Sequence, residues 1–139
     1  MNGLSLAYIG DAIYELEVRR HLLSLGLTKV NELQKRSKHY VSAKAHAALF
    51  EQMMVSNILT DDELDYFKRG RNAKSHTKAK NTDVITYRIS TGVEALFGYL
   101  YMSEQHERIL ELMTWIFEQV ETGSCLLYTS PSPRDRSLS

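Results

Sequence analysis

Two acidic residues lie in segments where a carboxylate is costly. Asp11 follows Gly10 within the apolar segment 6–13, and Glu94 lies in segment 91–98 with a glycine on each side of it. A buried carboxylate costs several kcal/mol unless a cation or hydrogen bonds compensate it, and glycine inside a helix usually marks a close approach of another backbone. If the two segments are helices packed against each other, their carboxylates meet. A divalent cation that prefers oxygen ligands, such as Mg²⁺, would then relieve their repulsion.

Each acid also has a purely structural interpretation. Asp11 would face solvent beside a glycine that serves only packing, and Glu94 would pair with an arginine such as Arg88 or Arg20. The hydrophobic periodicity does not distinguish these alternatives.

Segment 68–81 is strongly basic although the chain as a whole is neutral. It contains six Lys and Arg residues and no acid, whereas the whole chain has 17 basic and 17 acidic residues. Small and amide residues separate the charges, so the segment suits a phosphate backbone, bound by counterion release and by hydrogen bonds. The alternative is a solvated loop that balances the acidic residues of segment 104–121. We favour nucleic acid because so dense a cluster is unexpected in a neutral protein.

Apolar residues recur at helical spacing through most of the chain, and no stretch alternates with a period of two. The apolar face predicted for the first segment consists of Leu6, Ile9, Ile13, Leu16 and Leu23. A long helix is expected over 82–102 and a last one after Ser103. These patterns predict an all-α protein, a helical bundle.

Several helix boundaries are expected at residues whose side chains satisfy the free N–H groups of a first helical turn. Such caps are predicted at Asn31 with Gln34, at Ser42, at Thr60 with Glu63, and at Ser103. Gly26 is expected to end the first helix in a left-handed conformation.

Length and composition limit the protein to one modest domain. The 139 residues allow a single core, and the composition changes at Gly123, so we expect a domain over 1–123 and a disordered tail over 124–139 that has the character of a non-native extension. The single cysteine, Cys125, excludes an internal disulfide framework and a cysteine metal cage. The longest apolar run, 95–102, is too short for a membrane span, and no secretory signal is recognisable, so a cytoplasmic protein is expected.

Two motifs resemble those of a known enzyme family. Segment 6–13, Leu-Ala-Tyr-Ile-Gly-Asp-Ala-Ile, resembles the signature helix of the ribonuclease III catalytic domain, Leu-Glu-Phe-Leu-Gly-Asp-Ala-Val. Segment 91–98, Thr-Gly-Val-Glu-Ala-Leu-Phe-Gly, resembles that family's second motif, Asp-x-Phe-Glu-Ala-Leu-Ile-Gly. Segments 6–15, 41–44, 69–74 and 80–83 resemble Mini-ribonuclease III, the small form of the family without a double-stranded RNA-binding domain. The likeness runs from Asn2 to about Glu121.

The resemblance implies roles for individual residues. Asp11 and Glu94 match catalytic carboxylates that ligate Mg²⁺, while Ala7 and Thr91 stand where the larger enzymes have two further acids. Tyr8 matches the aromatic residue that the family inserts into a partner subunit, which implies a homodimer with the ribonuclease III-like endonuclease fold. The basic segment would then bind the substrate through Arg69, Arg71, Asn72, Lys74, Lys78 and Lys80.

The activity implied is the cleavage of double-stranded RNA with 5′-phosphate and 3′-hydroxyl ends, and the substrate implied is a stem of precursor 23S ribosomal RNA. Three other interpretations remain open. A non-catalytic double-stranded RNA-binding scaffold on the same fold is plausible because two acids are absent. An all-helical nucleotide pyrophosphohydrolase would also place acids around Mg²⁺, and a plain partner-binding module would not bind phosphate.

Overall fold

The computed structural model describes residues 1–74 and 83–123, and within them the chain forms six α-helices and no strand. The helices are α1 (Gly3–Ser24), α2 (Val30–Val41), α3 (Ala43–Ser56), α4 (Asp61–Arg71), α5 (Val84–Met102) and α6 (His106–Glu121). The predicted all-α fold is therefore confirmed. Lys78, Lys80 and the tail 124–139 lie outside the described residues, so the division at residue 123 stays a prediction.

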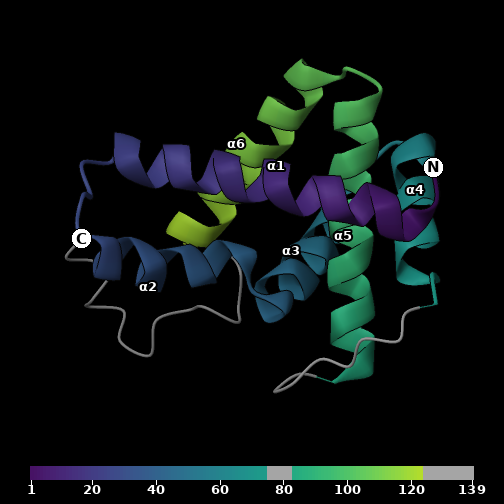
Figure 1. The fold of residues 1–139 in the computed structure, drawn as a ribbon, viewed down its shortest axis with the longest axis horizontal. Helices are drawn as coiled ribbons and strands as arrows, with labels where there is room; N and C mark the ends of the chain where they lie inside the picture. Colours follow the sequence, from purple (N-terminus) through teal and green to yellow (C-terminus); the bar gives the residue numbers. More distant parts are fainter. Residues whose placement is uncertain (75–82, 124–139) are drawn as a thin grey trace.

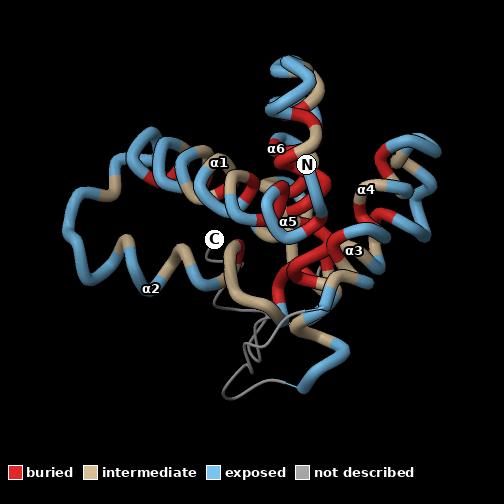
Figure 2. Tube along the Cα trace, turned by 45° about the vertical axis from the view of Figure 1, so that its right-hand side comes forward, coloured by how far each residue is buried: buried red, intermediate tan, exposed pale blue. Residues whose placement is uncertain are grey.

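Helix α5 is the central element of the fold. Helices α1, α3 and α4 pack directly on it, and α1 crosses its middle (Figure 1). The buried part of the chain is concentrated where these helices meet α5 (Figure 2). The main core includes Tyr14 and Val18 of α1, Met53 of α3, Phe67 of α4 and Phe97 of α5. None of the described helices is long and apolar enough to cross a membrane.

Helix α1 buries only part of the face predicted for it: Leu6 is buried, and Ile9 and Ile13 are partly buried. Leu16 and Leu23 are about half exposed, at 52% and 53%, whereas Tyr14, Val18 and Leu22 are fully buried. From Leu6 to Leu22 the buried positions recur every four residues and include Gly10, and the small residues Gly3 and Ala7 are buried beside them. Because small and aromatic residues occupy this face, counting leucine and isoleucine alone misplaces it.

Most predicted helix boundaries are correct, and two are wrong. Ser42 caps α3, Thr60 and Glu63 form a capping box on α4, and Gly26 has a φ of 91° after α1. Asn31 does not cap α2, because that helix begins at Val30, two residues earlier than predicted, with Lys29 at the cap position and no side-chain cap. Ser103 does not cap α6. Its hydroxyl instead donates to the carbonyl oxygen of Tyr99 at the end of α5.

Candidate active site

Helices α1 and α5 cross in direct backbone contact at two glycines. A side-chain carbon at Gly10 would overlap the carbonyl oxygen of Glu94, and one at Gly98 would overlap the carbonyl oxygen of Leu6. Only glycine allows two helix backbones to approach this closely. Asp11 follows Gly10 in the sequence, and Gly10 contacts the backbone of Glu94. The crossing therefore brings both acids to one place.

The carboxyl groups of Asp11 and Glu94 interact across this crossing. Asp11 is exposed, while Glu94 is only partly accessible. Burial, the charge of Asp11, a hydrogen bond with Asp11 and the charge of Glu15, in decreasing order of effect, together raise the pKa of Glu94 to about 8. At neutral pH the pair therefore retains a proton that an isolated glutamic acid would have lost. Such a pair is a favourable place for a cation.

Neither of the arginines suggested by the sequence neutralises Glu94. Among the described residues, Arg20 pairs with Glu17 at 3.5 Å, and no ion pair joins Glu94 to Arg20 or Arg88. Glu15 pairs with Arg19 at 3.1 Å. Within residues 1–74 and 83–123, therefore, no arginine partner of the kind expected from the structural interpretation pairs with Glu94.

The two positions that lack an acid are occupied by packing residues. Ala7 is buried and packs with Leu6 and Ala95, and the hydroxyl of Thr91 donates to the carbonyl oxygen of Tyr87 at 3.1 Å. Across residues 1–74 and 83–123, no group of three His, Cys, Asp or Glu side chains could hold a metal ion. A metal at this site would depend on the Asp11–Glu94 pair together with water and substrate oxygens.

The first part of the basic segment belongs to a helix rather than to a loop. Lys68, Arg69 and Arg71 lie in the last turn of α4, where their charges suit the negative end of the helix dipole. The guanidinium of Arg69 lies over the ring of Tyr66 at 4.5 Å, and that of Arg71 lies 5.7 Å from the ring of Phe67. Arg71 also donates from Nε to Oδ1 of Asn72 at 3.1 Å. These contacts orient the two guanidinium groups, and Asn72 and Lys74 follow directly with exposed side chains.

Two glycines that the sequence analysis did not assign to packing fix this basic turn against the site. A side-chain carbon at Gly70 would meet the side chain of Ala95 at 2.5 Å and the carbonyl oxygen of Thr91 at 2.8 Å on α5. Gly3 of α1 lies against the carbonyl of Arg69. The signal available in the sequence was a glycine at the end of a helical pattern, which Gly70 carries.

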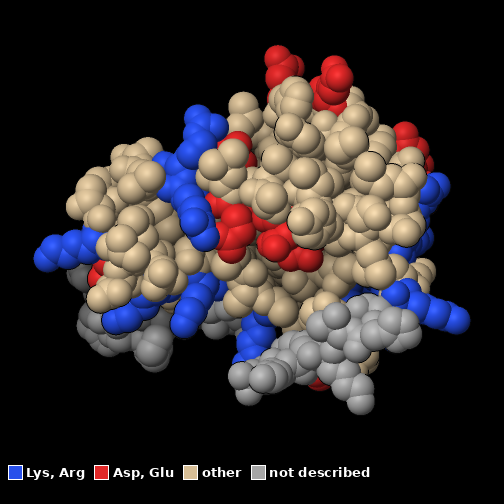
Figure 3. Space-filling model, viewed as in Figure 1, with Lys and Arg blue, Asp and Glu red and all other residues tan. Residues whose placement is uncertain are grey.

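Charge is distributed in a distinct pattern on the face that carries α1. Acidic side chains form a group near the middle of this face, and Lys and Arg side chains lie to both sides of it (Figure 3). A polyanion that reached the acids would therefore meet positive charge on either side.

Tyr8 is almost completely exposed on α1, at 84%. A hollow of about 250 Å³ lies near the same end of the helix, and its lining includes Leu6, Tyr66 and Tyr99. The rings of Tyr66 and Tyr99 are stacked 3.9 Å apart. A large exposed aromatic residue close to an aromatic hollow is typical of a protein–protein contact.

Comparisons with known proteins agree with this geometry. Residues 4–105 match the family described as the ribonuclease III domain. The chain is 55% identical to the Mini-ribonuclease 3 of Enterococcus faecalis over 86% of this chain and 91% of the relative. It is 51% identical to the Mini-ribonuclease 3 of Streptococcus pneumoniae over 87% and 94%. The fold is similar to a crystal structure of a Fusobacterium nucleatum protein, with a TM-score of 0.76 and 30% identity, covering 84% of this chain and 93% of that one.

Proposed function

Because this chain belongs to the ribonuclease III domain family and is an endoribonuclease, we propose that it cleaves double-stranded RNA at the Asp11–Glu94 pair with the help of Mg²⁺. The single observation that carries the proposal is the meeting of these two carboxyl groups at the crossing of α1 and α5. The curated relatives are named as Mini-ribonuclease 3, which agrees with this activity.

The chemistry of the pair suits Mg²⁺. Both donors are carboxylate oxygens, and a cation held by them would displace the proton that Glu94 retains at neutral pH. When bound, Mg²⁺ supplies a water of lowered pKa and offsets negative charge on the phosphate. Asp11 offers its carboxylate toward solvent and substrate, and Glu94 holds the inner side of the site. The cleavage leaves 5′-phosphate and 3′-hydroxyl ends.

The basic residues beside the site bind the RNA backbone. Arg69 and Arg71 are held in place by aromatic rings, and Asn72 and Lys74 extend the same surface. Lys78 and Lys80, which lie outside the described residues, continue it in the sequence. A-form RNA presents phosphates and 2′-hydroxyls rather than readable base edges, so such a surface selects a duplex by its shape. The natural substrate is a stem of precursor 23S ribosomal RNA, processed in the cytoplasm.

The enzyme acts as a homodimer in which Tyr8 enters the aromatic hollow of the partner. The exposure of Tyr8 and the nearby hollow beside Tyr66 and Tyr99 support this arrangement. A two-fold dimer matches the two-fold symmetry of a duplex backbone, so each subunit would cut one strand.

A gel assay on a defined RNA duplex, with and without Mg²⁺, tests the activity. We expect the parent to produce fragments only with the metal, and Asp11→Asn to lose cleavage while it keeps its helix content and its affinity for RNA. Glu107→Gln, at an exposed position on α6, is the control and should cleave normally. Binding of duplex RNA without cleavage under any metal condition would favour the scaffold interpretation instead.

A further inference from the structure

A second basic surface lies at the other end of α1 and has no place in the function proposed so far. Between residues 18 and 44 the chain has seven Lys and Arg residues and a single acid, Glu32. Six of these cations are exposed, and together they are named here the α2 surface: Arg19, Arg20, Lys29, Lys35, Lys38 and Lys44. In Figure 3 the basic side chains beside the central acids include those over the end of α1 and over α2.

The α2 surface keeps most of its charge available. Arg19 and Arg20 pair with Glu15 and Glu17 on their own helix, and such exposed pairs are worth about 0–1 kcal/mol, so they exchange readily for a phosphate. In the described part of the chain, no ion pair involves Lys29, Lys35 or Lys44.

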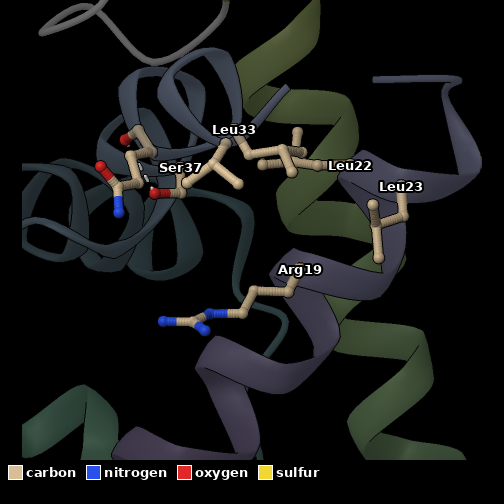
Figure 4. A pocket seen from close by; sticks show the side chains of 7 residues that line it. Arg19, Leu22, Leu23, Leu33 and Ser37 are labelled. Atoms are coloured by element: carbon tan, nitrogen blue, oxygen red, sulfur yellow. Dashed lines mark hydrogen bonds between the residues drawn. The ribbon is translucent and has the colours of Figure 1, made fainter. Parts of the chain in front are cut away.

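The α2 surface is held rigidly against the helix that carries Asp11. The hydroxyl of Tyr14 on α1 donates to the carbonyl oxygen of Tyr40 on α2 at 2.6 Å, and the hydroxyl of Tyr40 donates to Glu121 of α6 at 2.8 Å. Figure 4 shows Leu22 of α1 and Leu33 of α2 lining one pocket, with the guanidinium of Arg19 extending away from both leucines. Rigid placement lowers the entropic cost of binding.

Hydrogen-bonding groups accompany these charges. The pocket between α1 and α2, of about 290 Å³, has Arg19, Gln34 and Ser37 in its lining, and Gln34 and Ser37 alternate in sequence with Lys35 and Lys38. Guanidinium, amide and hydroxyl groups next to lysines are the groups that bind phosphate and sugar oxygens of nucleic acids. They favour an RNA backbone over an acidic protein as the partner.

The two basic surfaces lie at opposite ends of α1, with the acids between them. The basic turn of α4 contacts Gly3 at the start of α1, while α2 packs against its second half. The 22 residues of α1 span about 33 Å. We propose that the α2 surface is a second phosphate-binding surface, which holds the RNA duplex on the far side of the Asp11–Glu94 pair. This inference rests on the proposed function.

The test compares the parent with Lys35→Gln/Lys38→Gln by measuring RNA affinity at several salt concentrations in EDTA. For a duplex longer than α1, the variant should bind about tenfold more weakly at 0.1 M salt, and the slope of log affinity against log salt should become shallower by about two. A duplex too short to extend past the acids should bind both proteins alike. With Mg²⁺, the variant should show a raised KM and an unchanged kcat on the long duplex.

Two matched variants make the outcome decisive. Ser56→Glu/Thr114→Glu changes the net charge by the same amount at exposed sites on α3 and α6 and should keep the parent's affinity, while Lys35→Arg/Lys38→Arg should keep the parent's salt slope. If the Lys→Gln variant matches the Ser56→Glu/Thr114→Glu control, the α2 surface does not bind RNA and the inference is overturned. Cleavage by the parent would still support the proposed function in that case, whereas a parent that never cleaves duplex RNA would overturn the proposed function itself.

Discussion

Gly10 lies directly against the backbone carbonyl group of Glu94, so the closest approach of two helices and the candidate acidic pair are one structural unit. Backbone packing therefore fixes the two positions from which the carboxyl groups of Asp11 and Glu94 extend. A substitution at Gly10 can therefore disturb the acidic pair although it adds no charge and contacts no substrate.

Replacement of Gly10 by Ala should destabilise the protein and impair the site together. The added methyl group would overlap the carbonyl oxygen of Glu94 and force α1 away from α5. Overpacking of this kind costs about 1–3 kcal/mol, and the cost here should reach the upper end because a whole helix backbone has to move rather than one side chain. Urea unfolding measures the loss, with Ser56→Ala at an exposed helical position as a control expected to stay within about 0.5 kcal/mol. A Gly10→Ala protein of parental stability and activity would contradict the close contact.

Glu94 should make the metal-free protein less stable as the pH rises from 4.5 toward 8. Burial and the neighbouring Asp11 raise the pKa of Glu94 to about 8, above its ordinary value of 4.5. The folded state therefore holds a proton that the unfolded state loses within this window, so folding becomes less favourable as the pH increases. Burial lowers the pKa of His46 from 6.5 to about 4, which acts in the opposite direction below 6.5, so the net fall in stability is expected between pH 6.5 and 8. Unfolding midpoints measured in EDTA across this range would reveal the trend.

Glu94→Gln should flatten this pH dependence, because the amide has no proton to lose. Added Mg²⁺ should raise the unfolding midpoint of the parent at pH 8 and leave that of Glu94→Gln nearly unchanged. Glu107→Gln, an exposed substitution on α6, should behave like the parent in both measurements. Equal pH profiles for the parent and Glu94→Gln would show that the acidic pair is not coupled as described.

Neutralising the basic end of α4 should weaken RNA binding in a salt-dependent way. The triple variant Arg69→Gln/Arg71→Gln/Lys74→Gln should make the salt slope of duplex affinity shallower by about three, since each phosphate contact contributes about one. The charge-retaining variant Arg69→Lys/Arg71→Lys should keep the parental slope. An unchanged slope in the triple variant would mean that these residues form only a solvated surface.

Glu63 should contribute far more to the free energy of unfolding than Glu111, although both carboxylates pair with Arg108. It is buried, accepts hydrogen bonds from Arg108 at 2.7 and 2.9 Å, and completes the capping box of α4. Glu63→Ala leaves Arg108 without its inner partner and should cost about 3 kcal/mol. Glu111, the exposed partner of Arg108 at 3.1 Å, provides the control, and Glu111→Ala should cost less than about 1 kcal/mol. Urea unfolding of both variants tests the contrast, and similar losses would contradict it.

Much of the fold could be predicted from local chemistry. The box at Thr60 and Glu63 and the cap at Ser42 were recognisable because each depends on residues only three apart. The buried face of α1 was not recognisable, because Gly10 and Ala7 face inward where larger residues would have signalled burial. Their burial depends on what α5 presents opposite them, which a pattern within one helix does not contain.

The two acids of the candidate site could be predicted from the sequence, but the glycine contact that positions the basic residues beside them could not. Asp11 and Glu94 stood out as single acids beside glycines, and the structure brings their carboxyl groups together. The use of Gly70 as a contact with α5 was missed, because glycine is equally typical of a helix end. The same ambiguity hid the fact that Arg69 and Arg71 lie on a helix rather than on a loop.

The contact of Gly70 with α5 has a further consequence for where a substrate is cut. The carbonyl of Thr91, which Gly70 approaches, lies one helical turn before Glu94. Arg69 and Arg71, which would bind the phosphates, are thus held at a fixed distance from the acids by helical backbone. If these residues hold the RNA as proposed, the scissile bond should lie a set number of nucleotides from the phosphates that Arg69 and Arg71 bind, and lengthening the chain after α4 should leave that number unaltered.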